Sequence, residues 1–331
     1  MRKSIFYSFL ISVSLVIFSG CSSKKYYEPE DTVNHSVTIK DSTAVISSIS
    51  PDGATLENLK FISKDGISET SLEDGFEFLN NVDGTIIASN KDGKLYVKQK
   101  EKVNYYTFKK RVISASIFKS YISLVFIDNS IALYDIDKQS ITFKEYYKTS
   151  FLNDVKIANP IFLSTVVLCP TLDGKIIVVN FKTNQVVKTI NIDPESKVNN
   201  IIYFKTINDT LISATNKKLF VFENGKVKTK DINIKDVVVT KENIYVATLE
   251  GNLIKYDHSL RELLNKKYRF AKFYTIGFTK YLYALESQGY IVRLDNNFEN
   301  EKVFDFSFDE DNEAIFIDDT LYFDDKYILL K

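Results

Sequence analysis

Residues 172–187 read LDGKIIVVNFKTNQVV and contain the pattern that decides the fold. A β-branched run, Thr165–Cys169, precedes the turn Leu172–Gly174, and a second run, Lys175–Val179, follows it. A polar turn then leads into a third run, residues 185–190. Short runs of Val and Ile between Asp, Gly and Asn turns are typical of antiparallel strands in a compact sheet.

The same phrase recurs along the chain, with clear copies around Gly93, Gly251 and Gly289 and weaker ones elsewhere. The second turn residue of each copy lies at positions 93, 130, 174, 217, 251, 289 and 325. The spacings run from 34 to 44 residues with a mean near 39. This period suits four short strands, the content of one β-propeller blade. A further turn at Asp65-Gly66 lies too close to Gly93 for a full copy and predicts an irregular first blade.

A length of 331 residues allows either two domains or one large repetitive domain, and the repeat favours the second. Helical solenoids share the period, but the runs here show no apolar spacing of the helical kind. A β-sandwich would show alternating patterns without a fixed period. Residues 30–331 divided by the period give a value near eight, so we expect an all-β propeller of eight blades, with seven possible, each of four antiparallel strands.

The last copy ends before an outer strand. Residues 320–323 and 327–330 form its final two runs, and only Lys331 follows. An open sheet edge there would favour aggregation. We therefore expect an N-terminal strand, from His35 to Ile39 or from Thr43 to Ser48, to supply the missing strand and close the ring.

The first twenty residues read as a signal peptide. Arg2 and Lys3 form a positive start, and the apolar stretch Ile5–Phe18 is too short to span a bilayer. The ending Ser19-Gly20-Cys21 resembles the bacterial lipobox, in which cleavage between Gly20 and Cys21 leaves a lipidated, N-terminal cysteine.

An ordinary secretory signal or a short membrane anchor is the alternative to a lipobox. We expect Cys21 to carry the lipid, palmitate included, because two or more acyl chains give stable anchoring. Ser22, where some lipoproteins have Asp, predicts the outer membrane. The expected organisation is a lipoprotein signal peptide over 1–20, a lipidated cysteine and flexible polar tether over 21–34, and the propeller over 35–331.

The composition excludes several classes of function. Forty-three basic and 43 acidic residues balance, and the mature chain has 41 and 43, so a general nucleic-acid binder is not expected. Two histidines cannot make a His-rich metal site. Two cysteines, one of them lipidated, leave no intrachain disulfide.

The phrase over 172–187 resembles the quinoprotein-type (PQQ-like) propeller repeat, a D-G turn followed by an apolar strand ending in Asn180. Asn184 replaces the usual second-turn Gly, and the Trp that closes each repeat of that family is absent from the whole chain. A lipobox followed by this propeller resembles the BamB-like lipoproteins of the outer-membrane β-barrel assembly machinery. The resemblance implies a periplasmic scaffold whose partners are that machinery or its substrates.

We expect no enzyme, because the residues that quinone-dependent dehydrogenases use are missing. Those enzymes hold their cofactor on a Trp and, in part, on adjacent cysteines, and neither is present. No cofactor, metal site or catalytic residue is therefore predicted. His258 in Asp257-His258-Ser259 reads as a solvated turn rather than a triad, and His35 reads as part of the tether. Cys169 reads as a small buried hydrophobe.

Three charged clusters have open interpretations. The acidic stretch 309–313 is either a loop charge, a partner-facing patch or a calcium site, although the EF-hand glycine is missing. The basic clusters Lys109–Arg111 and Lys266–Arg269 read as solvated faces or partner patches.

Taken together, the sequence predicts a non-enzymatic scaffold on the periplasmic face of the outer membrane that binds other proteins. Pairing with exposed strand edges of barrel proteins is one mode of binding that fits this expectation. The alternative is a ligand-binding or sensory propeller that uses its central channel. A ring of inward-facing polar or aromatic residues would be its signature.

Overall fold

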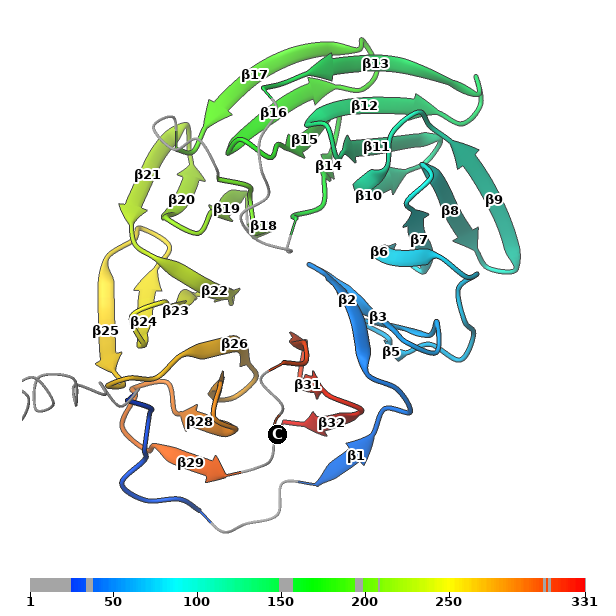
Figure 1. Ribbon diagram of the computed structural model, residues 1–331. Coiled ribbons are helices and arrows are strands. Elements are labelled where there is room, and N and C mark those ends of the chain that lie inside the picture. The colour runs from blue at the N-terminus through cyan, green and yellow to red at the C-terminus, as the bar shows by residue number, and fades with distance from the viewer. Residues whose placement is uncertain are drawn as a thin grey trace, which may run out of the picture.

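The chain folds into a ring of eight sheets (Figure 1). The computed structural model describes residues 25–33, 38–148, 157–193, 199–207, 209–305, 308 and 311–330. Within these residues, the regular elements are strands β1–β32, arranged as eight four-stranded antiparallel sheets. The expected all-β class and eight blades are thus confirmed, and the seven-bladed alternative is wrong.

Seven blades use four consecutive strands each, ordered from the channel outward. Blade 1 holds β2 (Ile46–Ser50), β3 (Gly53–Leu56), β4 (Phe61–Ser63) and β5 (Gly66–Ile67). Blade 2 holds β6 (Phe76–Val82), β7 (Thr85–Asn90), β8 (Lys94–Gln99) and β9 (Lys102–Thr107). Blade 3 holds β10 (Val112–Phe118), β11 (Tyr121–Phe126), β12 (Ser130–Asp135) and β13 (Ser140–Tyr146). Blade 4 holds β14 (Ile161–Leu163), β15 (Val166–Pro170), β16 (Lys175–Asn180) and β17 (Gln185–Asn191). Blade 5 holds β18 (Tyr203–Ile207), β19 (Thr210–Ala214), β20 (Lys218–Glu223) and β21 (Lys226–Asp231). Blade 6 holds β22 (Ile234–Val239), β23 (Asn243–Thr248), β24 (Asn252–Asp257) and β25 (Glu262–Lys267). Blade 7 holds β26 (Phe273–Phe278), β27 (Leu282–Glu286), β28 (Tyr290–Leu294) and β29 (Lys302–Asp305).

Blade 8 joins the two ends of the propeller. It contains β30 (Ala314–Ile317), β31 (Thr320–Phe323) and β32 (Lys326–Leu329), and its outer strand is β1 (Ile39–Asp41). Ile39 lies opposite Ile328, and Asp41 lies opposite Lys326. The expected closure by an N-terminal strand is confirmed, and its position matches the first of the two candidate segments more closely. The second candidate, Thr43–Ser48, overlaps the inner strand β2 of blade 1 instead.

The recurring turn lies between the second and third strands of its blade and faces one side of the ring. Gly93 has φ 85° and Gly251 has φ 82°, which explains why glycine is favoured there. In blade 3 the equivalent backbone position is Asn129, with φ 60°, one residue before the marker used in the sequence.

Blade 1 is irregular, as expected, but the Asp65-Gly66 turn has a different place from the other markers. It joins the third and fourth strands, β4 and β5, of that blade. The connection between the second and third strands is the segment 57–60, in which Leu59 takes the positive φ of 66°. Tight turns of both kinds use the same residue types, so the sequence did not distinguish them.

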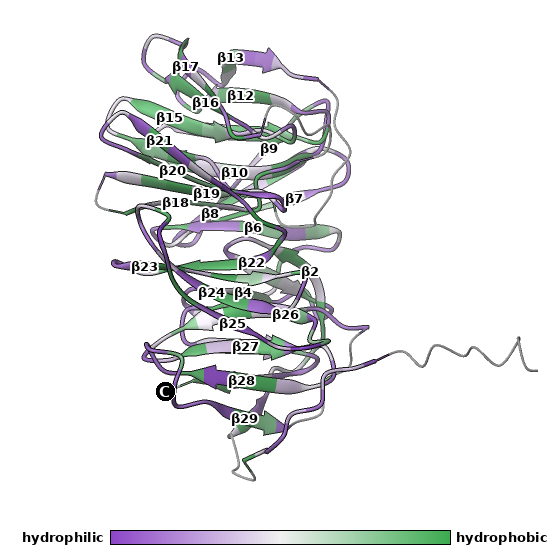
Figure 2. Cartoon of the chain, turned by 90° about the vertical axis from the view of Figure 1, so that its left-hand side faces the viewer, coloured by the Kyte–Doolittle hydropathy of each residue, from purple (hydrophilic) through white to green (hydrophobic). Residues whose placement is uncertain are grey.

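The hydrophobic core lies between neighbouring blades rather than at one centre. Middle strands such as β19 and β23 are buried along their whole length because a blade covers each face. Figure 2 shows hydrophobic residues along β15, whereas the outer strand β25 combines hydrophilic residues with two leucines. The blades therefore stack as successive layers around the ring.

Residues 25–33 are packed against blades 6 and 7, although the sequence predicted a flexible tether over 21–34. Tyr27 is 8% exposed, and its ring meets those of Tyr268 and Tyr290 edge-on at centroid distances of 5.9 and 5.7 Å. The Val33 amide donates to the Val303 carbonyl at 2.8 Å. The partners of Tyr27 come from the far end of the sequence, which explains why the polar pattern did not reveal this contact.

The remaining N-terminal predictions lie outside the described residues. These are the signal peptide over 1–20, its cleavage at Gly20 and Cys21, the lipid on Cys21, and the tether residues 21–24 and 34. Within the part of the chain that the structure describes, no helix has the length and apolar character needed to cross a bilayer.

Two glycines of blade 2 allow the stability cost of a positive φ to be measured separately from the cost of a close atomic contact. Gly84 and Gly93 have φ of 80° and 85°, but a Cβ at Gly84 would meet nothing within 4 Å, whereas one at Gly93 would lie 2.3 Å from the Phe108 carbonyl oxygen. We expect Gly84→Ala to lower the free energy of unfolding by ~1–2 kcal/mol. Gly93→Ala should cost ~1–3 kcal/mol more through overpacking. Urea unfolding measures both, and equal losses would contradict the contact.

The neighbouring tyrosines 26 and 27 test the packed N-terminal segment. Tyr26 is 45% exposed and serves as the control. Because Tyr27→Ala removes a buried ring, we expect tryptic cleavage after Lys25 to become roughly tenfold faster or more, each tenfold corresponding to ~1.4 kcal/mol of local opening free energy. Tyr26→Ala should leave the rate unchanged. Similar rates in both variants would mean that residues 25–33 are not held by Tyr27.

Candidate functional site

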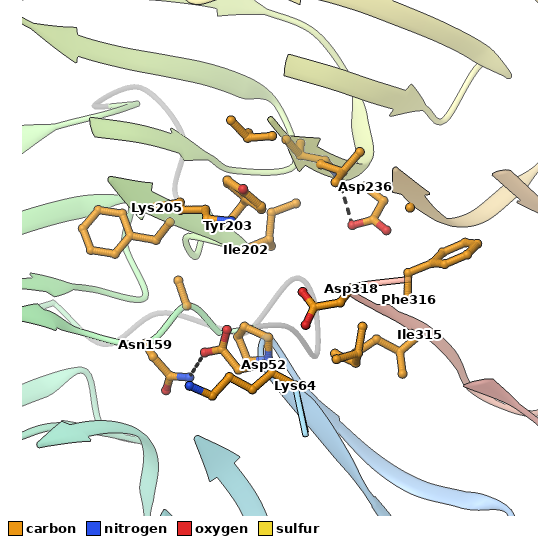
Figure 3. A pocket seen from close by; sticks show the side chains of 18 of the residues that line it. Asp52, Lys64, Asn159, Ile202, Tyr203, Lys205, Asp236, Ile315, Phe316 and Asp318 are labelled. Atoms are coloured by element: carbon orange, nitrogen blue, oxygen red, sulfur yellow. Dashed lines mark hydrogen bonds between the residues drawn. The ribbon is translucent and has the colours of Figure 1, made fainter. Parts of the chain in front are cut away.

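A cavity of about 460 Å³ lies on the axis of the ring (Figure 3). Every blade except blade 3 contributes lining residues, mostly from its innermost strand. Of the residues that the structure describes, five charged ones line this space: Asp52 and Lys64 of blade 1, Lys205 of blade 5, Asp236 of blade 6 and Asp318 of blade 8. The channel therefore has both signs of charge within an otherwise mixed polar and apolar wall.

Asp52 is the most perturbed carboxyl group of the channel. Its side chain is exposed to the channel lumen, and the surrounding blades shield it from bulk water. Burial raises its pKa above the usual range, and the hydrogen bond from Asn159 and the charge of Lys205 oppose that shift. Ionised Asp52 is consequently less stable in the folded chain than in water.

Asn159 holds four blades together at the channel wall. Its amide nitrogen donates to Asp52 Oδ2 at 2.7 Å and to the Leu79 carbonyl at 3.1 Å. Its amide oxygen accepts from Ser114 Oγ at 2.8 Å and from the Ala115 amide at 3.3 Å. Asn159 thus joins elements of blades 1, 2 and 3 to the segment that leads into blade 4, so its role is structural.

Polar residues recur at one place on the inner strands, directly after a β-bulge. Ser114, Asp236 and Thr275 each follow a register shift and are buried. Ser114 Oγ donates to the Ala158 carbonyl at 2.9 Å, and Thr275 Oγ1 donates to Asp236 Oδ2 at 2.6 Å. These groups bond neighbouring blades rather than pointing together at a ligand. The sequence missed them because a bulge has no clear signature in a single strand.

The residues for which the sequence suggested a structural role in place of a catalytic one do not come together. His258 Nε2 lies 3.2 Å from the Thr240 carbonyl, and Ser259 Oγ donates to Asp257 Oδ1 at 2.7 Å, so the three form a turn and not a relay. Cys169 is buried beside Ser123, and burial raises the pKa of its thiol to about 12. His35 lies outside the described residues.

Among the described residues, no three His, Cys, Asp or Glu side chains are grouped so as to hold a metal ion. Asp309 and Glu310 of the acidic stretch lie outside those residues. Its described part is engaged with neighbouring elements: the Asn312 amide donates to Asp324 Oδ1 at 3.0 Å, and Tyr274 donates to the Asn312 carbonyl at 2.9 Å.

Both basic clusters lie where an outer strand leads to the next inner strand, on the same side of the ring: the first is in the loop between β9 and β10, and the second spans the end of β25 and the loop to β26. In the first, Arg111 pairs with Glu77 at 2.6 Å beside a second cavity of about 290 Å³. In the second, Lys266 pairs with Glu301 at 2.5 Å, while Arg269 and Phe270 are exposed.

The outer rim of blades 3 and 4 exposes apolar side chains. Ile141 of β13 is 41% exposed, and Val186 and Val187 of β17 are 40% and 61% exposed. Thr142 Oγ1 donates to Asn184 Oδ1 at 3.0 Å, so the two strands are joined at this point. Figure 1 shows β13 and β17 side by side along the edge of the ring. We refer to Ile141, Val186 and Val187 as the apolar rim.

The fold and these surfaces define the class of protein: an eight-bladed β-propeller whose blades are hydrogen-bonded to one another around the channel and whose outer edge carries an apolar rim. No protein-family model matches the chain. Membership of the quinoprotein-type repeat family therefore stays a prediction.

Two curated relatives are both named plasminogen-binding protein PgbB, from Helicobacter pylori. The protein of strain J99 is 32% identical over 210 residues, and that of strain 26695 is 31% identical over 209 residues. Each match spans 60% of this chain but only 39% of the relative.

Solved structures of known propellers resemble the chain over most of its length. BamB from Moraxella catarrhalis has a TM-score of 0.65 at 13% identity, covering 89% of this chain and 99% of that one. Sqt1 from Saccharomyces cerevisiae has a TM-score of 0.63 at 12% identity, covering 88% of this chain and 97% of that one. At such identities the likeness shows the fold alone, and it confirms the expected resemblance to BamB at that level.

Asp52→Asn tests the electrostatics of the channel. Because the folded pKa of Asp52 lies above its unfolded value, its ionisation lowers stability as the pH rises through the folded pKa. We expect Asp52→Asn to be more stable than the natural chain at neutral pH and equally stable below the unfolded pKa, near 4. Urea unfolding across this pH range measures the difference. A constant difference at all pH values would contradict the assignment.

Proposed function

We propose that this protein is a non-enzymatic scaffold that is held on the periplasmic face of the outer membrane by a lipid on Cys21 and that binds other proteins during assembly of outer-membrane β-barrels. The apolar rim is the observation that carries the proposal. Its three aliphatic side chains lie on the rigid outer edge of two joined blades, where burying them against a partner would be favourable.

The outer strands limit the way in which a partner can dock. Register shifts opposite β13 and β17 leave Thr142 and Val187 without a paired residue, which interrupts any continuous strand addition. The unshifted outer strand β21 has lysines along its length instead. We therefore place the main contact on the side chains of the apolar rim and confine strand pairing to the regular part of β17.

The channel supports a scaffold better than an enzyme. Its buried polar groups, such as Asn159 and Asp236, are engaged in bonds between blades. Such bonds make the ring rigid, and a rigid ring presents fixed loops and edges to a partner.

The similar proteins agree with a role in protein binding. The relatives in Helicobacter pylori are named for binding plasminogen, and BamB shares the fold. The lipobox at Ser19-Gly20-Cys21, together with a propeller, resembles the BamB-like lipoproteins, which connects the proposal to barrel assembly. Labelling with a palmitate analogue should mark the natural chain and not Cys21→Ser.

A photo-crosslinking residue at Val187 tests the partner and its place. In intact cells we expect adducts with barrel-assembly proteins or unfolded barrel proteins. A crosslinker at Val227, which is 53% exposed on the outer strand of blade 5, is the matched control. Val187→Lys should weaken co-purification of that partner roughly tenfold or more, as expected for a central apolar contact, whereas Val227→Lys should not.

Deleting the gene should also lower the amount of outer-membrane barrel proteins. Unchanged barrel levels together with equal crosslinking at both positions would overturn the proposal.

A second candidate function is binding of a small charged ligand in the channel. The volume of about 460 Å³ and the lumen-facing Asp52, Lys64 and Lys205 favour it. A ligand specific for the native state raises the melting temperature, so a thermal-shift screen of amino acids and sugars measures it.

A further inference from the structure

An exposed cluster of cationic and apolar side chains surrounds the loop between blades 6 and 7. Tyr26 is 45% exposed, Leu249 is 59% exposed and Phe270 is 41% exposed. We call this cluster the basic-aromatic patch, and it consists of Lys25, Tyr26, Leu249, Lys267, Arg269 and Phe270.

Contacts hold the patch together. Arg269 lies 4.8 Å and the Lys25 ammonium 5.5 Å from the centre of the Phe270 ring. The Tyr268 amide donates to the Gly251 carbonyl at 2.8 Å, which brings the turn containing Leu249 against the loop. The N-terminal segment, a turn of blade 6 and the loop after β25 thus form one surface.

Phe270 exposes an aromatic ring in a loop whose counterpart elsewhere in the ring exposes lysines. Its φ is 64°, in the left-handed region that a bulky residue rarely adopts. The corresponding loop between blades 2 and 3 begins with buried Phe108 and continues with the exposed lysines 109 and 110. An exposed aromatic ring is therefore not a requirement of this type of loop.

The charge of the patch is positive. Lys25, Lys267 and Arg269 are exposed in it, and Glu28 and Glu250 are exposed acids nearby. A third neighbouring acid, Glu301, pairs with Lys266 and accepts from the Tyr268 hydroxyl. The Glu250 carboxylate accepts from the Asn233 amide. Asp311 and Glu313 belong to the next loop on the same side, but Glu313 lies by the second cavity near the channel, away from the outer rim. Each cation near an anionic lipid surface contributes about 1 kcal/mol.

The patch lies within reach of the expected anchor. Lys25 lies four positions after Cys21, and four residue steps span at most about 14 Å. Tyr27 fixes the following segment to blades 6 and 7, so lipid on Cys21 would bring this part of the ring against the membrane. Amphipathic aromatic rings with lysine and arginine beside them are the side chains that favour the headgroup region.

We propose that the basic-aromatic patch contacts phospholipid headgroups and orients the propeller on the membrane, an inference that rests on the proposed lipid anchor. Blades 6 and 7 then face the lipid. In Figure 1 the apolar rim on β13 and β17 lies across the ring from residues 25–33, so it points away from the membrane. The orientation leaves the rim free for proteins in the periplasm.

The chain contains no tryptophan, so one introduced tryptophan reports on one place. Phe270→Trp probes the patch. Phe118→Trp is the matched control, because Phe118 is 37% exposed, has the Lys119 ammonium 5.2 Å from its ring centre, and lies at the opposite end of an inner strand. The full chain, purified from envelopes, is placed in vesicles of equal parts phosphatidylethanolamine and phosphatidylglycerol with brominated acyl chains. Mass spectrometry of the N-terminal peptide reports whether Cys21 carries lipid.

We expect the tryptophan at 270 to lose most of its fluorescence to bromine quenching and the tryptophan at 118 to lose none. Lys25→Glu with Arg269→Glu in the first variant should restore the fluorescence. A lipidated protein with equal quenching at both positions, or with none, overturns the orientation and leaves the anchor intact. If Cys21 carries no lipid, the proposed anchor is wrong, and the patch is then tested by adding the same vesicles to the soluble protein. Selective quenching of the tryptophan at 270 would support contact of the patch with lipid, and no quenching would overturn it. Selective capture of a protein at 270, without quenching, also overturns it.

Discussion

The pairing of β1 with β32 is the contact on which the whole propeller depends. Three residues near the start of the described chain complete a blade whose other strands lie at the end of the sequence. The Ser42 amide extends the join by donating to the Asp325 carbonyl at 2.7 Å. A ring of sheets that is open at one point would expose two apolar sheet faces and an unpaired edge. Because the closing strand is short, the packing of residues 25–33 on the neighbouring blade 7 adds to the stability of this region.

Closure also determines the channel. Asn159 reaches Asp52 across 107 residues of sequence, and this bond exists only because blades 1 and 4 are held at fixed positions in the ring. Similar bonds between blades at Ser114, Asp236 and Thr275 engage polar groups that would be costly to bury alone. The channel is therefore part of the framework, and the surfaces that remain for partners are on the outside of the ring.

Two such outer surfaces lie far apart. The apolar rim is on blades 3 and 4, and the basic-aromatic patch is on blades 6 and 7 beside the N-terminal segment. They differ in chemistry, since one is aliphatic and nearly uncharged and the other combines cations with aromatic rings. A rigid propeller keeps both at a fixed relative orientation, so the position of one toward a membrane or a partner sets the direction of the other.

The sequence by itself determined the blade. Runs of Val and Ile such as Lys175–Val179, ended by turns at Gly174 and Asn184, specify short strands locally, and their period of about 39 residues specifies eight copies. It also indicated that an N-terminal strand closes the ring and that Cys169 is buried. Only the tertiary structure decided which side chains meet across blades. Tyr27 and Tyr268 lie more than two hundred residues apart in the sequence, and Asn159 and Asp52 lie about a hundred apart. A local sequence pattern has no information on contacts between such distant residues. The bulges, the packed N-terminal segment and both outer surfaces follow from how the blades pack around the ring, because burial is a property of neighbours that the chain meets only when it is folded.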